Sequence, residues 1–460
     1  MKDKRQSTFA KASVDEERKK GKIKKLYFIK MKRIVLILVI LIIPRLSAVN
    51  AQKIVTLKEC YNMAMSANAL AGEKEAYSSI SKIKDENLKK GWLPSLDASA
   101  SLSYNSDVVD FSSAFSSIPG MSSVLKPMPQ DQYKLTLDIN QVIYDGGAIK
   151  SARALEKTDL QINEKQTETD LYKLRGQINA YYFNVLLLNR QKELLNNYLN
   201  LVRKRILSMQ SAINNGVILK SDIDVLSSEK LKIEQQLTEN GLLRLAYFKI
   251  LSDMTGSEIS DSTMFVLPEQ AIELNGDLLR PELQIFDLRK EQLSAGIQMA
   301  QSRRMPKAFG FATLGYGNPP GLDFFNDSFD TYYIVGAGIK WNIFDWNRVK
   351  NEKQLIGIQK VIIDNRKKDL SDNLKRMLQS KNSEINSMKE MLRTDSELME
   401  LRKRISATAG SQYENGTITA TEYLNELNSE QQAIINYEIH KVNLAMAKIE
   451  YLNISGKEIE

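Results

Sequence analysis

The chain has 460 residues, 43% of them hydrophobic, and a formal net charge of +8. Residues 1–51 hold 14 of the 64 Lys and Arg residues and 4 of the 56 Asp and Glu residues, which leaves 50 basic and 52 acidic residues in the rest. The positive charge therefore belongs to the leader, and the composition argues against a nucleic-acid-binding surface on the body of the chain.

The leader has the pattern of an export signal. An unbroken apolar run over 34–43 follows two basic residues, and the small residues Val49 and Ala51 come after it. This pattern predicts a secretory signal peptide over 31–51 with cleavage after Ala51, because the apolar run is too short to cross a bilayer as a helix. Residues 1–30 are interpreted as an extension from an upstream start codon, with a cytoplasmic tail as the alternative.

A helix is predicted to begin after the leader, at a capping box formed by Thr56 and Glu59. Leu57, Cys60 and Tyr61 share its apolar face, so we expect Cys60 in the core. Because Cys60 is the only cysteine, no intramolecular disulfide is possible.

The body of the chain repeats itself. At an offset of 200 residues, Ile139, Ile143, Tyr144, Asp145 and Lys150 recur as Ile339, Ile343, Phe344, Asp345 and Lys350, and Asn215, Gly216 and Ile218 recur as Asn415, Gly416 and Ile418. At an offset of 212, Pro94, Ala100, Leu102 and Tyr104 recur as Pro306, Ala312, Leu314 and Tyr316. We therefore expect two copies of one structural unit, 52–255 and 281–460, joined by a linker over 256–280.

Each unit contains two predicted strands. Apolar and polar residues alternate over 95–104 and 132–140 in the first unit, and over 308–316 and 333–341 in the second. The opposite face of the second pair is less polar, since it carries Phe309, Phe311, Tyr332 and Ile334. Strands of about ten residues with one apolar face are typical of a transmembrane barrel.

A soluble sheet with one buried face would show the same alternation. The export signal, tyrosines near the strand ends, and polar loops over 105–130 and 317–331 favour the barrel. Four strands cannot close a barrel, and an open edge in lipid leaves backbone groups without hydrogen-bond partners. Closure must therefore come from other copies, and three copies would supply twelve strands and twelve helices.

A very long helix is predicted after each second strand. The runs 147–213 and 347–413 each contain 67 residues and no proline, which corresponds to about 100 Å of helix at 1.5 Å per residue. Between Leu171 and Ile213, apolar residues alternate spacings of three and four, with Lys192 as the one polar member. This register predicts a coiled coil, so these helices must pack laterally against others.

Each long helix is expected to turn back at an Asn-Gly pair. Ser221 with Asp224, and Thr419 with Glu422, have the spacing of helix-start signals just after those pairs. The chain would then return as a second helix and close an antiparallel hairpin in each unit. Pro281 is expected at the first position of the helix that opens the second unit.

Several motifs in this order resemble the TolC-like outer-membrane efflux protein family. They are Tyr144-Asp145-Gly146-Gly147, the two Asn-Gly-x-Ile tips and Arg280-Pro281-Glu282-Leu283, together with the signal peptide, the paired strands and the duplication. Each motif is weak alone, but their order and spacing over about 52–455 are specific.

The resemblance implies a membrane α+β fold. It implies a trimeric 12-stranded transmembrane β-barrel, four strands per chain, continued by a long α-helical periplasmic barrel of coiled-coil hairpins. It also implies docking of the helical tips to a periplasmic adaptor and, through it, to an inner-membrane pump. The expected function is passive conduction across the outer membrane in a tripartite efflux or type I secretion system.

The resemblance also implies a constriction formed by acidic residues just after the tip of the second unit. The matching positions carry Glu422 and Asn425, so one of the two acids is replaced by an amide. Asp222 and Asp224 of the first unit are candidates for additional negative charge nearby. The alternative for Glu422 is a helix-capping acid at the positive end of a helix, and both roles are compatible.

The tips themselves are candidates for adaptor contact, with plain turn formation as the alternative. The candidate residues are Gly216, Val217, Ile218, Gly416, Thr417 and Ile418. No catalytic residues, metal site or cofactor are predicted, and His440, the only histidine, is expected to be a surface polar residue. A non-conducting periplasmic coiled-coil scaffold or adhesin anchored in the outer membrane is the alternative function.

Overall fold

The computed structural model describes residues 54–110, 127–214, 220–272, 276–323 and 326–459. The chain falls into two compact units. The larger unit, 55–260 with 265–460, holds all the described helices and a four-stranded sheet. In the smaller unit, the described residues are Ile54 and 261–264. The predicted signal peptide over 31–51 and the extension over 1–30 lie outside the described residues.

The four-stranded sheet is antiparallel throughout. Its strands are β2 (Ser95–Tyr104), β3 (Asp131–Tyr144), β5 (Lys307–Asn318) and β6 (Asp330–Lys340). They are ordered β2-β3-β5-β6, so β2 and β6 are the two edges. All four predicted strands are present, and β3 continues beyond the predicted end at 140, through an irregularity between Val142 and Tyr144.

The strand register gathers the apolar residues on one face of the sheet. Ala98 lies opposite Leu137, Leu137 opposite Leu314, and Leu314 opposite Tyr333, so one apolar row crosses all four strands. Side chains of this face are very exposed, with 79% for Tyr333 and 77% for Ile339. A large exposed apolar face is unusual in a water-soluble monomer and indicates a surface made for another environment.

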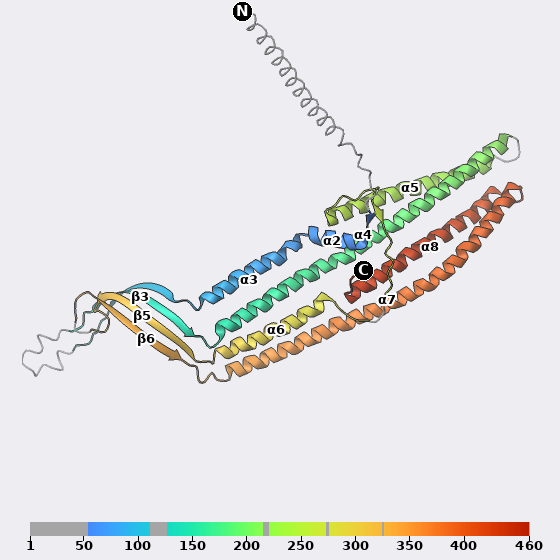
Figure 1. Ribbon diagram of the computed structural model, residues 1–460. Coiled ribbons are helices and arrows are strands. Elements are labelled where there is room, and N and C mark those ends of the chain that lie inside the picture. Colours follow the sequence, from blue (N-terminus) through green and yellow to red (C-terminus); the bar gives the residue numbers. More distant parts are fainter. Residues whose placement is uncertain (1–53, 111–126, 215–219, 273–275, 324–325, 460) are drawn as a thin grey trace, which may run out of the picture. The chain divides into compact units, whose positions relative to one another are not determined.

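Four helices run side by side beyond the sheet (Figure 1). They are α3 (Glu73–Lys90), α4 (Ala148–Asn214), α6 (Pro281–Ser302) and α7 (Arg348–Glu414). α4 packs against both α3 and α6, and α6 packs against α7, so α3 and α7 lie at the edges of this layer. The predicted 67-residue helices are present as α4 and α7, each displaced by one residue.

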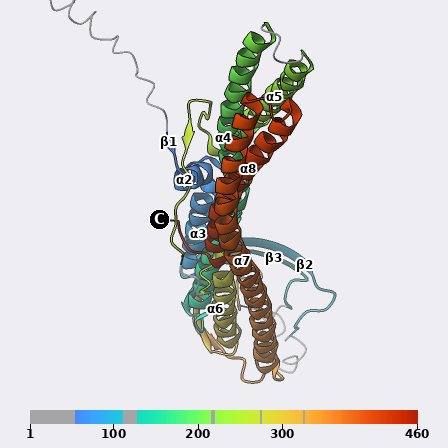
Figure 2. The same ribbon diagram turned by 90° about the vertical axis from the view of Figure 1, so that its right-hand side faces the viewer.

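Two return helices complete the hairpins: α5 (Lys220–Thr255) packs on α4, and α8 (Ala420–Ser455) packs on α7 (Figure 2). Thr419 caps α8 as predicted. The predicted start at Ser221 is wrong, because α5 already includes Lys220 and therefore contains Ser221. The order helix, strand, strand, long helix, return helix thus occurs twice, in a first half (α3, β2, β3, α4, α5) and a second half (α6, β5, β6, α7, α8).

The core lies where α4 meets the first helix, α2 (Leu57–Ala67), which is followed by the short helix η2 (Ala69–Gly72). The capping box of Thr56 and Glu59 is present, and Cys60 is fully buried, so both predictions are confirmed. The predicted linker also contributes, since it contains β4 (Met264–Phe265), which pairs with β1 (Ile54–Val55). In the larger unit, Phe265 packs on Tyr182 of α4 with ring centroids 5.1 Å apart.

The heptad register of α4 is confirmed by burial. Among the described members from Leu171 to Met209, every apolar side chain is buried or half-buried, and the polar member Lys192 is half-buried. Pro281 stands at the start of α6 as predicted. Among the described residues, no helix is both long and apolar enough to span a membrane.

Candidate functional site at the helical tips

The tip of the second half is a tight turn built by glycine and backbone hydrogen bonds. Gly416 has φ of 68°, a left-handed conformation that favours glycine. The backbone N–H of Thr417 donates to the carbonyl of Gln412 at 2.9 Å, and its hydroxyl donates to the same carbonyl at 2.8 Å. Gly416 and Thr417 are exposed, whereas Ile418 is half-buried against the core between the hairpins. The turn-forming role of Gly416 is therefore observed.

The tip of the first half carries three of the candidate adaptor contacts. Gly216, Val217 and Ile218 lie outside the described residues.

Glu422 caps the helix that follows the second tip. Its carboxylate accepts the backbone N–H of Thr419 at 2.8 Å and the Thr419 hydroxyl at 3.0 Å. In return, the Thr419 hydroxyl accepts the N–H of Glu422 at 3.2 Å. The two hydrogen bonds from Thr419 favour the charged form and lower the pKa of the Glu422 carboxyl. The capping role is observed, and it keeps the side chain ionised as a gate would require.

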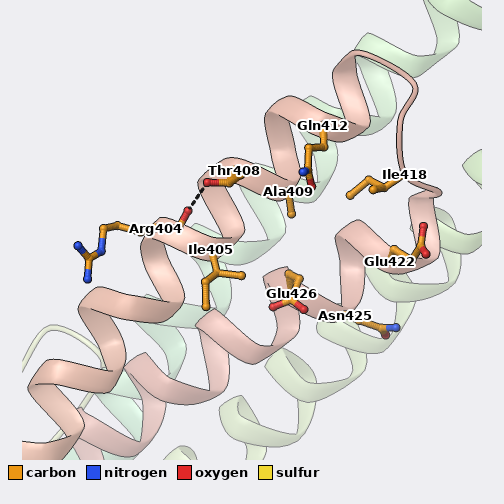
Figure 3. Close-up of a pocket in the computed structure, with 9 residues that line it drawn as sticks. All are labelled: Arg404, Ile405, Thr408, Ala409, Gln412, Ile418, Glu422, Asn425 and Glu426. Carbon is orange, nitrogen blue, oxygen red and sulfur yellow. Dashed lines mark hydrogen bonds between the residues drawn. The ribbon is translucent and has the colours of Figure 1, made fainter.

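Glu422 and Asn425 border one groove between α7 and α8, with a volume of about 510 Å³ (Figure 3). α7 supplies Arg404, Ile405 and Gln412 to this groove. Glu426 also borders it and lies 3.3 Å from Arg402 through their charged groups. The structure therefore brings the two predicted gate residues together beside a third, unpredicted carboxylate.

The acids predicted in the first half lie elsewhere. Asp222 and Asp224 occupy the first turns of α5 and do not line the groove of Glu422. Burial raises the pKa of Tyr413, and the carboxylate of Asp222 adds to this rise, which places Asp222 near the end of α7. Asp224 is exposed. Within one chain, the four predicted gate residues do not form a single acidic cluster.

A link between the two hairpins was not predicted. Arg205 of α4 forms an ion pair with Glu414 at the end of α7, and its guanidinium lies 5.1 Å from the ring centroid of Tyr423. Tyr423 in turn stacks on Tyr413 with centroids 5.4 Å apart. The hydroxyl of Tyr198 also lies 2.7 Å from Asn428 Oδ1. These contacts join the first hairpin to the second close to the tip.

His440 differs from the sequence prediction. It is half-buried between α7 and α8, where its Nδ1 lies 2.5 Å from Asp395 Oδ2. It is therefore an interhelical polar contact and not a freely exposed residue. Within the described residues, no group of three or more His, Cys, Asp and Glu side chains could hold a metal ion.

Comparison with known proteins supports the resemblance drawn from the sequence. Residues 87–240 match the model of the family described as outer membrane efflux protein. No curated protein sequence matches the chain.

Three solved structures share the fold over most of their length. A membrane protein from Pseudomonas aeruginosa has a TM-score of 0.63 and 14% identity, covering 89% of this chain and 91% of its own. The Campylobacter jejuni CmeC outer membrane channel has a TM-score of 0.59 and 16% identity, covering 87% and 85%. The outer membrane protein VceC from Vibrio cholerae has a TM-score of 0.61 and 14% identity, covering 88% and 97%. The segment 87–240 and the shared fold together confirm that this chain is similar to the TolC-like outer-membrane efflux protein family.

Proposed function

We propose that the chain is one subunit of a trimeric outer-membrane channel that serves a tripartite efflux or type I secretion system. In this proposal it conducts substrates passively from an inner-membrane pump and a periplasmic adaptor to the exterior, without catalysis. The observation that carries the proposal is the sheet, which has two open edges and one continuous apolar face.

The sheet supports closure by other copies. In lipid, each unpaired backbone group at an open edge costs several kcal/mol, so a four-stranded sheet cannot stand alone there. Pairing the β2 edge of one copy with the β6 edge of the next removes both edges. Three copies then form twelve strands, a barrel whose outer face is the apolar face described above.

The helical layer has the same two open sides. At its α3 edge, Ile80 and Ile83 are exposed, and at its α7 edge Leu355, Ile358 and Val361 are exposed. The α3 edge directly precedes β2 in the chain, and the α7 edge directly follows β6. A contact from α3 of one copy to α7 of the next would therefore accompany the strand pairing and bury these apolar side chains.

The solved channels of similar fold support the location. CmeC is described as an outer membrane channel and VceC as an outer membrane protein. By analogy with them, we place the sheet of this chain in the outer membrane and the helical hairpins in the periplasm.

The tips supply the gate and the adaptor contacts in this proposal. Glu422 and Asn425 would restrict ion flow. The exposed residues Gly416 and Thr417, with Ile418 beside them and the repeat positions 216–218, would meet the adaptor. The Arg205–Glu414 ion pair holds the two hairpins together, so opening of the tip requires this contact to break.

Planar bilayer recording of the purified full-length chain tests the proposal. We expect a heat-modifiable trimer that shows small, discrete, stable openings, and higher conductance after Arg205→Ala. A folded sample that remains silent, also with Arg205→Ala and Glu422→Ala, would favour the scaffold or adhesin. The silent variants distinguish that outcome from a wild-type channel that is merely closed.

A further inference from the structure

The face of the sheet opposite the apolar face carries a row of aromatic side chains in the second half. We call Phe309, Phe311 and Tyr332 the aromatic platform. Each ring covers a glycine directly across the β5–β6 pair: Phe309 covers Gly338, Phe311 covers Gly336, and Tyr332 covers Gly315. A Cβ atom at these glycines would lie 2.7, 2.5 and 2.2 Å, respectively, from the nearest ring atom.

The glycines therefore let the rings lie flat on the backbone. Glycine weakens a strand interior, because it has no side chain to pack and loses more backbone entropy on folding. Three such positions in two neighbouring strands are explained by the space that the rings need. The rings of Phe309 and Phe311 are adjacent, with centroids 6.4 Å apart and planes inclined by 36°. The rings of Phe309 and Phe311 leave one aromatic face open above the sheet, where a solute can stack, whereas Gly321 also lies against the ring of Tyr332.

The same positions in the first half carry carboxylates and hydroxyls. The pair Asp97 and Asp138 occupies the place that Phe309 and Gly338 have in the second half. Two residues along each strand, Ser99 and Thr136 occupy the place of Phe311 and Gly336. The fold therefore does not itself require aromatic residues on this face.

Asp97 and Asp138 lie on the same face of the sheet, paired with each other across β2 and β3. The hydroxyls of Thr136 and Thr313 donate to the two carboxylate oxygens of Asp138 at 2.8 and 2.5 Å. Thr313 belongs to β5, two residues from Phe311, so Asp138 lies diagonally across the β3–β5 pair from Phe311. The rings of Phe309 and Phe311 lie on the other side of β5, over glycines of β6. Within the described part of the chain, no Lys or Arg forms an ion pair with Asp97 or Asp138. Of the lysines of this face, Lys134 lies toward the far ends of the strands, whereas Lys307 and Lys340 form the pair next to Phe309 and Gly338.

We propose that this face binds aromatic cations during their passage through the conduit. An aromatic group of the solute stacks on Phe311, while its positive charge lies toward Asp138 and Asp97 and away from Lys307 and Lys340 at the other end of the platform. This inference rests on the proposed channel, which makes the face the lining of a water-filled barrel. The apolar face suits lipid, whereas the face of the platform carries two carboxylates and suits water. The platform would therefore line the inside of the barrel. The carboxylates disfavour anions, and a cation without rings gains no stacking.

Equilibrium binding of tetraphenylphosphonium to the full-length chain in nanodiscs tests this inference, with empty nanodiscs as the background. We expect saturable binding that is weakened about three- to fivefold by Asp138→Asn and by Phe311→Leu. Ser101→Ala, further along β2 on the same face and opposite Lys134, serves as the control and should leave binding unchanged. Tetrabutylammonium, a cation of similar size without rings, should bind more weakly than tetraphenylphosphonium.

The outcomes separate this inference from the proposed function. Openings in a bilayer combined with tetraphenylphosphonium binding that neither variant changes would overturn the aromatic-cation face and leave the channel standing. A bilayer that stays silent also with Arg205→Ala and Glu422→Ala, combined with binding that Asp138→Asn and Phe311→Leu weaken, would overturn the channel and keep the binding face. Loss of the Phe311 ring could loosen β5 and β6. If Phe311→Leu no longer migrates as a heat-modifiable trimer, the binding result for Asp138→Asn alone decides the test.

Discussion

The two halves of the molecule make the same turn from strand to long helix with different residues. Between β3 and α4, Gly146 and Gly147 have φ values of 71° and 86°. Between β6 and α7, Trp346 and Asn347 have φ values of 53° and 62°. Glycine adopts this conformation freely, whereas a side chain with a Cβ is strained there. The fold therefore imposes the turn, and the second half forms it despite its local sequence.

An exposed aromatic residue precedes both turns, Tyr144 in the first half and Phe344 in the second, and the strained turn adds Trp346. Trp346 is 82% exposed, and its ring meets that of Phe344 edge to face with centroids 4.9 Å apart. In a membrane-anchored channel, exposed aromatic residues where strands end are typical of the lipid–water interface. The turn of the first half is therefore relaxed, whereas the turn of the second half is strained and exposes the contacting rings of Phe344 and Trp346.

The two long helices also differ in burial. α4 lies between α3 and α6 and buries Ile178 and Val185 completely, whereas α7 lies at the edge and leaves Leu355, Ile358 and Val361 exposed. The two helices have equal length and equivalent places in their halves. What differs is the number of neighbours within one chain, and the proposed trimer would supply the missing neighbour of α7.

The largest expected effect is on fold stability, and it is tested by truncating one isoleucine in each of these two helices. Ile178→Ala in α4 should destabilise the fold by about 2–5 kcal/mol, because it leaves a cavity in a fully packed core. Ile358→Ala in α7, where the side chain is 59% exposed, should change the unfolding of a single chain very little. It should instead weaken assembly. Thermal unfolding and the fraction of heat-modifiable trimer measure the two effects separately.

Equal losses of fold stability in the two variants, measured on unassembled chain, would contradict this contrast. Ile358→Val serves as the control for nonspecific effects on α7, since it keeps most of the apolar surface.

The next effect concerns the aspartates that begin the long helices. Asp145 accepts the backbone N–H of Gly147 at 2.8 Å and that of Ile149 at 2.5 Å. Asp345 accepts the N–H of Val349 at 3.1 Å, and Arg304 lies 3.8 Å from it. We expect Asp145→Ala to cost about 1–2 kcal/mol and Asp345→Ala about 0.5–1 kcal/mol, as for lost helix caps. Urea titration measures the free energy of unfolding of both variants, with Asp145→Asn and Asp345→Asn as controls. A larger loss of stability in Asp345→Ala than in Asp145→Ala would contradict this prediction.

A smaller, stabilising effect is expected where the strained turn is relaxed. Asn347→Gly should raise stability by up to about 1 kcal/mol, because glycine removes the Cβ strain at a left-handed residue. The reverse change, Gly147→Asn, should destabilise by a similar amount, since no atom lies within 4 Å of the added Cβ and only backbone strain is introduced. Differential scanning calorimetry compares the two, and effects of the same sign would show that the turn is not strained.

Much of the fold was predictable because its patterns are periodic. Alternation by two residues located β2, β3, β5 and β6, and spacings of three and four located the buried stripe of α4. The capping boxes at Thr56 and Thr419 were readable because both partners lie within one helical turn. Local geometry decides these features, so one sequence suffices.

The tips were less predictable because their contacts join distant segments. Arg205 and Glu414 are separated by 209 residues, and Arg205 does not stand at a core position of the α4 heptads. The register between the hairpins creates their ion pair, and no local pattern signals it. The Ser221 spacing failed as a start signal because Lys220 already belongs to α5. The contact of Phe309 and Phe311 with glycines of the neighbouring strand could not be predicted, because it depends on the strand register.

The smallest expected effect tests whether Glu422 acts as a cap or as a gate. The pKa of Glu422 is lowered by its hydrogen bonds from Thr419, so its charged form stabilises the tip at a pH above the ordinary range of a glutamate. That contribution should disappear as the pH falls through the lowered pKa. Hydrogen exchange of the first turn of α8 should therefore quicken, relative to the rest of α8, in acid. Glu422→Gln should remove this pH dependence, and Asp224→Asn in the first half should leave it intact.

The same substitutions separate the two roles of Glu422. Glutamine also fits the third position of a capping box, so Glu422→Gln at pH 7 should largely keep the cap while it removes the charge. Thr419→Ala should weaken the cap and keep the charge. If Glu422 is a gate, Glu422→Gln changes single-channel conductance and block by cations more than Thr419→Ala does. If it is only a cap, Thr419→Ala has the larger effect on exchange at the tip, and neither variant changes the block by cations.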